Sequence, residues 1–132
     1  MKLCVAGAVF VSAASSAAVA APIELTCNGT LHQYLPTVVH AALSPTAAQV
    51  DLEAMRISTP FGRYGITSVD NSSVSFNGTW KGWLVAGSLD RTTGEMNMRW
   101  LSKEEQTKLY RREKAQMGMS ADLKCSVASR LF

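Results

Sequence analysis

The stretch Gly82-Trp-Leu-Val-Ala-Gly-Ser-Leu-Asp-Arg-Thr-Thr-Gly-Glu-Met-Asn-Met-Arg-Trp-Leu101 decides the fold of this chain. It opens with an apolar run, passes through a polar turn and ends in strict alternation of apolar and polar residues, which is typical of a β-hairpin. Asp90 can accept hydrogen bonds from the amides that follow it, and Gly94 can adopt the positive φ that closes such a turn. The stretch therefore predicts a hairpin with these core side chains: Trp83, Val85, Leu89, Met96, Met98 and Trp100.

Further strand signals flank the hairpin on both sides. Short apolar or alternating segments bounded by turn-forming residues occur at 23–31, 48–52, 55–59, 64–69, 74–77 and 120–127. Residues 34–45 contain two prolines and no periodicity, which predicts a surface connection, and Asn77-Gly78 is a strong turn dipeptide. With the hairpin these segments predict an all-β, mainly antiparallel domain, a small eight-stranded barrel or sandwich.

One helix is expected before the last strand. Ser102-Lys-Glu-Glu105 is a capping-box sequence, and residues 106–116 are rich in good helix formers up to Gly118. Because few of these residues are apolar, we expect a short surface helix packed by one edge, with the order of residues 103–114 left open.

The N-terminus carries an export pattern. Met1-Lys2 precedes an apolar run, and Ala18-Val-Ala20 forms a small-residue cleavage site. A membrane anchor is disfavoured because the apolar run is far shorter than the roughly 20 residues that span a bilayer. Residues 1–20 are therefore predicted to be a signal peptide, residues 21–132 a single domain, and the location periplasmic or secreted.

Two of the three cysteines fall near the ends of that domain. Cys4 lies within the predicted signal peptide, which leaves Cys27 and Cys125. In an exported chain such a pair most simply forms a disulfide, although two buried thiols remain an alternative. The bridge would close a loop of nearly the whole domain, worth on the order of 4 to 5 kcal/mol in the chain-entropy model. It would also bring the first and last strands together.

The chemistry-bearing residues do not form a catalytic pattern. His32 and His40 are the only histidines, and Ser88 lacks the Gly-x-Ser-x-Gly context of a hydrolase nucleophile. No metal-ligand cluster, phosphate loop or dinucleotide fingerprint is present in the sequence. We therefore predict no catalytic residue, no metal ligand and no cofactor, and we expect the protein not to be an enzyme.

The best binding candidates lie beside the hairpin. Trp80 is placed by the predicted turn in a loop, where an aromatic side chain is often available for recognition, and Lys81 follows it. With a net charge of +3 the chain does not demand a nucleic-acid partner, and no integral membrane span is expected after the signal peptide. The partner is expected to be a periplasmic or extracellular protein.

Two family resemblances accompany these patterns. Leu25-Thr-Cys-Asn-Gly-Thr30, Ile66-Thr-Ser-Val-Asp70, the Gly87-to-Gly94 hairpin and the terminus from Asp122 to Phe132 resemble small exported alphaproteobacterial proteins without assigned function. That resemblance implies export and a β fold, and it carries no mechanism.

The second resemblance is to periplasmic C-type lysozyme inhibitors, which are small disulfide-bonded β-barrels. Phe61-Gly-Arg-Tyr64 and Phe76-Asn-Gly-Thr-Trp-Lys-Gly82 are similar in order to their two inhibitory loops. The chain departs from that pattern, because no serine precedes Gly62 and Trp80 replaces a threonine. The resemblance implies that Tyr64 and Lys81 would enter a lysozyme cleft.

The sequence as a whole predicts a noncatalytic exported β-domain that acts by binding or as an envelope accessory protein. A lysozyme inhibitor acting through loop residues is one alternative. A lipocalin-like carrier of a small apolar ligand is the other, and it requires a pocket of at least roughly 300 Å³.

Overall fold

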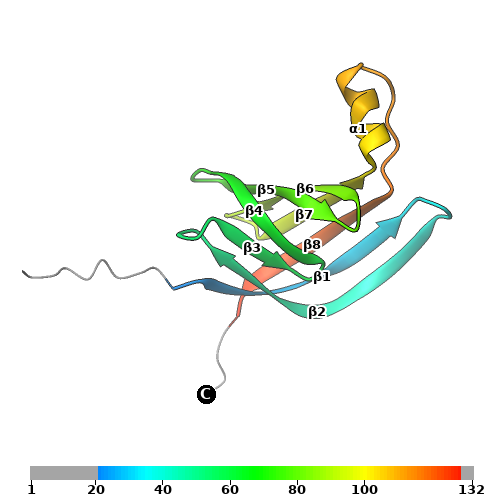
Figure 1. The fold of residues 1–132 in the computed structure, drawn as a ribbon. Coiled ribbons are helices and arrows are strands. Elements are labelled where there is room, and N and C mark those ends of the chain that lie inside the picture. The colour runs from blue at the N-terminus through cyan, green and yellow to red at the C-terminus, as the bar shows by residue number, and fades with distance from the viewer. Residues whose placement is uncertain (1–20, 129–132) are drawn as a thin grey trace, which may run out of the picture.

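The protein is a closed antiparallel β-barrel with one helix, as a computed structural model that describes residues 21–128 shows (Figure 1). The elements in chain order are β1 (Ile23–Gln33), β2 (Val39–Asp51), β3 (Arg56–Thr59), β4 (Gly62–Val69), β5 (Ser73–Trp80), β6 (Trp83–Asp90), β7 (Glu95–Leu101), α1 (Lys103–Tyr110) and β8 (Met119–Val127). Each strand pairs with the next, and β8 pairs with β1. The predicted eight-stranded fold is confirmed as a barrel rather than a sandwich. The predicted signal peptide, residues 1–20, lies outside the described residues.

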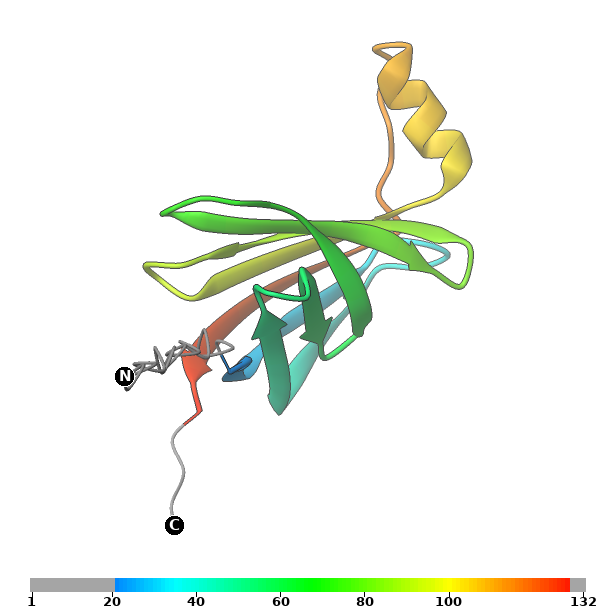
Figure 2. The same cartoon turned by 60° about the vertical axis from the view of Figure 1, so that its left-hand side comes forward.

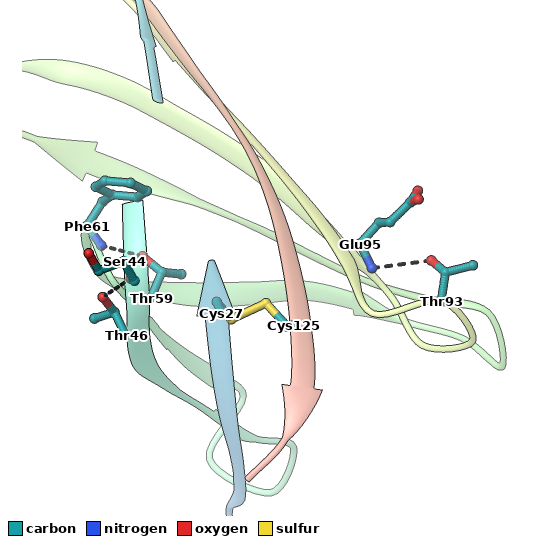
Figure 3. The surroundings of a disulfide bond; sticks show 8 residues. All are labelled: Cys27, Ser44, Thr46, Thr59, Phe61, Thr93, Glu95 and Cys125. Atoms are coloured by element: carbon teal, nitrogen blue, oxygen red, sulfur yellow. Dashed lines mark hydrogen bonds between the residues drawn. A yellow bond between two sulfur atoms is a disulfide. The ribbon is translucent and has the colours of Figure 1, made fainter. Parts of the chain in front are cut away.

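The barrel closes where β1 meets β8. Cys27 and Cys125 are directly opposite each other in this pairing and form a disulfide across it (Figure 3). Closure pairs the backbone groups that β1 and β8 would otherwise leave as open edges. The expected disulfide and the expected contact of the first and last strands are therefore both present.

The β6–β7 hairpin forms as predicted. The Asp90 carboxylate accepts hydrogen bonds from the amides of Thr92 and Thr93 at 2.8 and 2.9 Å. Gly94 has a φ of 78°, and a Cβ at this position would lie 2.1 Å from the Cys125 carbonyl oxygen. Glycine is thus required here both by the backbone conformation and by the close approach of β8.

The core is built from the inward-facing alternate residues of the strands. Of the six core side chains predicted from the hairpin, five are buried, and Trp83 is only partly buried at its edge. Trp100, Phe76, Ile57, Met96 and Met98 are the largest fully buried side chains. They belong to one hydrophobic cluster with the other buried strand residues.

The predicted surface connection at residues 34–45 was wrong, because β2 begins at Val39 and runs through Pro45. The register between β1 and β2 shifts between Cys27 and Gly29, so the chain around Pro45 lies in a bulge. A proline is tolerated at a bulge because no ladder bond from its nitrogen is needed there. This half of β2 is also mostly exposed, which explains its lack of apolar periodicity.

The predicted turn at Asn77-Gly78 was also wrong. β5 continues to Trp80, and the turn falls at Lys81-Gly82, whose φ values are 47° and 83°. Two positive φ values match a two-residue type I′ hairpin turn. Gly78 has a packing role instead, since a Cβ there would lie 2.8 Å from the Tyr64 ring.

Helix α1 begins as predicted and ends early. The Ser102 hydroxyl accepts a hydrogen bond from the Glu105 amide at 3.2 Å. The helix ends at Tyr110 instead of residue 116, and it buries no residue. The Glu105 carboxylate then accepts a bond from the Gln116 amide at 2.8 Å, which ties the returning chain to the helix. Figure 2 shows α1 projecting from one end of the barrel.

Candidate ligand-binding site

A pocket of about 320 Å³ has Trp100 and Met119 in its lining, which come from the strands before and after α1. We call it the aromatic pocket, and its lining comes from β1, the β3–β4 turn, β5, β7 and β8: Leu31, Pro60, Phe61, Trp80, Trp100 and Met119. All six side chains are largely apolar. The volume reaches the lower end of the range for small-molecule sites.

Trp100 supplies the one polar group of interest in this lining. Its side chain is 1% exposed, and its indole Nε1 has no hydrogen-bond partner. Among residues 21–128 it is the single buried side-chain nitrogen or oxygen without one. A buried tryptophan N–H usually finds an acceptor, and leaving such a donor unpaired costs about 1 to 3 kcal/mol. A residue of the aromatic pocket's lining therefore carries a buried hydrogen-bond donor that no protein group uses.

Phe61 packs edge-to-face against Trp100, with the ring centroids 5.4 Å apart and the planes at 85°. An aromatic face is a much weaker acceptor than an oxygen atom. The β3–β4 turn that carries Phe61 is held by the Thr59 hydroxyl, which donates to the Gly62 carbonyl and accepts from the Phe61 amide. Phe61 is thus a fixed wall of the pocket.

Tyr64 fixes the same turn from inside the barrel. Its side chain is 4% exposed, and its hydroxyl donates to the Phe61 carbonyl oxygen at 3.2 Å. Burial raises the pKa of the Tyr64 hydroxyl, so it remains a proton donor at neutral pH. The predicted binding residue Tyr64 therefore supports the pocket from behind and presents no side chain at the surface for a lysozyme cleft.

Of the other two predicted binding residues, Trp80 lines the pocket and Lys81, the next residue in the chain, is not part of the lining. Trp80 is not in a loop as expected. It is the last residue of β5, opposite Trp83, and is partly buried against the core. The exposed Lys81 places its Nζ 4.8 Å from the centre of the Trp80 ring. This cation–π contact holds a positive charge over the ring of a tryptophan that lines the pocket.

A second pocket, of about 410 Å³, opens at the other end of the barrel. Its apolar walls come mainly from Ile23, Leu25, Val50, Leu52, Val74 and Leu89, and the β6–β7 turn forms its rim. The Asp90 carboxylate at this rim is already bonded to its own turn, and the amides of Thr93 and Thr92 lower its pKa. This pocket contains no unpaired buried side-chain donor or acceptor among the described residues, so it offers less basis for selecting a ligand.

The sequence did not identify most of the pocket lining as ligand-contacting. Leu31, the adjacent pair Pro60 and Phe61, and Met119 come from three separate segments that only barrel closure brings together. Trp100 was predicted as core, which is correct, but alternation cannot show that its N–H lacks an acceptor. The clustering of all three tryptophans between positions 80 and 100 was the one available signal.

Comparison with known proteins adds no identification. No family model matches the chain, and no curated protein or solved structure is significantly similar to it. Within residues 21–128 no helix has the length and apolar character that crossing a membrane requires.

Proposed function

We propose that the protein is an exported, noncatalytic β-barrel that binds a small, mainly apolar molecule carrying one hydrogen-bond acceptor, such as a ketone or ester oxygen. The observation that carries this proposal is the buried, unpaired Nε1–H of Trp100, a residue whose side chain lines the apolar aromatic pocket. Of the functions expected from the sequence, this is closest to the small-ligand carrier.

The pocket's chemistry supports this ligand class. The rings of Phe61 and Trp80 and the aliphatic side chains of Leu31 and Met119 offer apolar contact at about 25 cal/mol per Å² of ligand surface removed from water. An acceptor oxygen at Nε1 of Trp100 would relieve the unpaired donor. A site built around a buried donor disfavours an analogue without the acceptor, because that complex leaves the donor unpaired.

Two features support export. The first 20 residues have the pattern of a signal peptide, and the Cys27–Cys125 disulfide is of a kind that persists in oxidising compartments. The lysozyme-inhibitor alternative has less support, because Tyr64 is buried behind the pocket wall.

A matched ligand pair tests the proposal. 1-Indanone and indane have nearly the same shape, but only the ketone has an acceptor oxygen. Titrations followed by ¹H–¹⁵N NMR would report on the three indole N–H signals of Trp80, Trp83 and Trp100. We expect 1-indanone to bind about tenfold more tightly than indane, as one recovered buried hydrogen bond implies, and to shift the Trp100 signal downfield.

Two variants give the controls. Trp100→Phe removes the donor and keeps an aromatic ring, so it should abolish the preference for the ketone while indane still binds. Trp83→Phe changes a tryptophan outside the aromatic pocket and should preserve the preference. Equal binding of the two compounds to the unaltered protein, or no binding of either at millimolar concentration, would refute the proposal.

A further inference from the structure

The two histidines of the chain are eight positions apart in sequence and lie side by side on the paired strands β1 and β2. His32 and His40 are directly opposite each other in the β1–β2 pairing. Their Nδ1 atoms are 2.6 Å apart, and the ring centroids are separated by 4.8 Å. Two imidazole nitrogens thus converge on one point at the protein surface.

A carboxylate from the neighbouring strand orients one of these rings. Asp122 on β8 lies diagonally from His32, which faces Ser120, and its Oδ2 is 3.3 Å from His32 Nε2. A proton on Nε2 is favoured by this carboxylate, which leaves the Nδ1 of neutral His32 with a free lone pair. The same arrangement, a carboxylate on the far nitrogen of an imidazole, orients histidine ligands in metalloproteins and raises their basicity.

We propose that His32 and His40 chelate a divalent transition-metal ion of the Cu²⁺ or Zn²⁺ type through their Nδ1 atoms, with Asp122 as the positioning residue for His32. In the metal-free state the proton of His40 Nδ1 bridges the two rings. The metal ion takes the place of this proton, which passes through solvent to the Nε2 atom of the same ring, so that His40 remains a neutral imidazole. Water molecules occupy the remaining coordination positions. Imidazole nitrogens suit both metals, and Cu²⁺ is expected to bind more tightly.

The geometry requires only a small adjustment. With metal–nitrogen distances near 2.05 Å and a tetrahedral angle, the two nitrogens would lie roughly 3.3 Å apart, about 0.7 Å farther than in the proton-bridged pair. His40 is exposed and can rotate by this amount, whereas His32 is partly buried and held by Asp122. The Tyr34 ring lies 6.5 Å from the His32 ring, centre to centre, and its hydroxyl bonds to the Ser120 hydroxyl at 3.1 Å.

The site would be open and exchangeable. Within the described part of the chain, no group of three or more His, Cys, Asp or Glu side chains is arranged to hold a metal ion. A two-histidine site completed by water is therefore expected to bind more weakly than a structural centre. It lies on the outer face of the barrel wall, so the inference is independent of ligand binding in the aromatic pocket.

Calorimetric titration of the untagged, disulfide-bonded protein with CuCl₂ and with ZnCl₂ tests this site. Electron paramagnetic resonance of the Cu²⁺ sample should show coupling to imidazole nitrogens. We expect one ion per chain, and His40→Ala should weaken binding at least tenfold. Asp122→Asn should weaken it about 10- to 100-fold while both histidines still couple to copper, as expected for a positioning residue.

The control is Glu24→Gln, which alters an exposed carboxylate of β1 that bonds Gln49 and lies away from the pair. It should bind metal like the unaltered protein. Unchanged affinity in His40→Ala, absence of nitrogen coupling, or no binding at millimolar concentration would overturn the proposal. Because His40 is exposed, its replacement should leave the fold intact, which a melting curve verifies.

Discussion

Removal of the Cys27–Cys125 disulfide should destabilise the barrel strongly. The bridge joins directly opposed residues of β1 and β8 and closes a loop with a sequence separation of 98. In the chain-entropy model a loop of this length is worth about 4.7 kcal/mol, because the cross-link restricts the unfolded chain. The double variant Cys27→Ala/Cys125→Ala should lose at least this amount, since it also leaves a small cavity at the fully buried Cys27.

The free-energy loss converts into a measurable shift in melting temperature. A domain of this size unfolds with an entropy of about 0.23 kcal/mol per kelvin, so a loss of 4.7 kcal/mol lowers the Tm by about 20 °C. Circular dichroism on heating measures this shift. Urea titration measures the m-value, which should rise in the variant because the unfolded chain exposes more surface without the cross-link.

Reduction provides the matched control. Cys27 is inaccessible in the folded protein, so the native protein must be reduced in denaturant and then refolded with reductant present. Reduction should reproduce the Tm loss in the unaltered protein and have no effect on the double variant. A Tm shift below about 5 °C with an unchanged m-value would refute the idea that the disulfide stabilises the fold by restricting the unfolded chain.

Two further predictions concern the β6–β7 turn. Gly94→Ala should destabilise the protein by several kcal/mol more than Gly82→Ala in urea titrations. Both glycines have positive φ, but a Cβ at position 94 would meet the Cys125 carbonyl, whereas a Cβ at position 82 would meet open space. Equal losses of stability in the two variants would contradict this role of Gly94. The hydrogen bonds of Thr93 and Thr92 lower the folded-state pKa of Asp90, so ionised Asp90 stabilises the fold above the unfolded pKa of about 3.9, and that contribution is lost as pH falls through the folded pKa. Unfolding curves should therefore show a smaller loss of stability on acidification below about pH 4 for Asp90→Asn than for the unaltered protein, and parallel pH profiles would exclude this contribution.

Local rules predicted the parts of the fold that local interactions control. The β6–β7 turn depends on Asp90 bonding amides two and three positions ahead and on the positive φ of Gly94, and both can be inferred from a few adjacent residues. The Ser102 cap likewise depends on a residue three positions away. The end of α1 was missed because the bond from the Gln116 amide to Glu105 spans eleven positions and helix propensity does not include it.

The two strand errors have a different cause. Pro45 and Asn77-Gly78 are turn signals in isolation, but a bulge opposite β1 accommodates the proline, and the Tyr64 ring takes the space beside Gly78. Tertiary packing can override turn propensity, because burying a tyrosine side chain is worth more than a dipeptide preference.

By itself the sequence determined the strand-rich architecture, the β6–β7 hairpin and the cysteine pair. Alternation and turn chemistry are properties of short segments, and the cysteine pair follows from the number and positions of the cysteines. Only the tertiary structure decided that the sheet closes into a barrel. Closure gathers Leu31, Phe61, Trp80, Trp100 and Met119 around one pocket, and strand pairing sets His32 against His40. These groupings depend on the register between strands that are distant in sequence. A shift of one residue in that register would turn each inward-facing side chain of a strand to the outer face of the barrel.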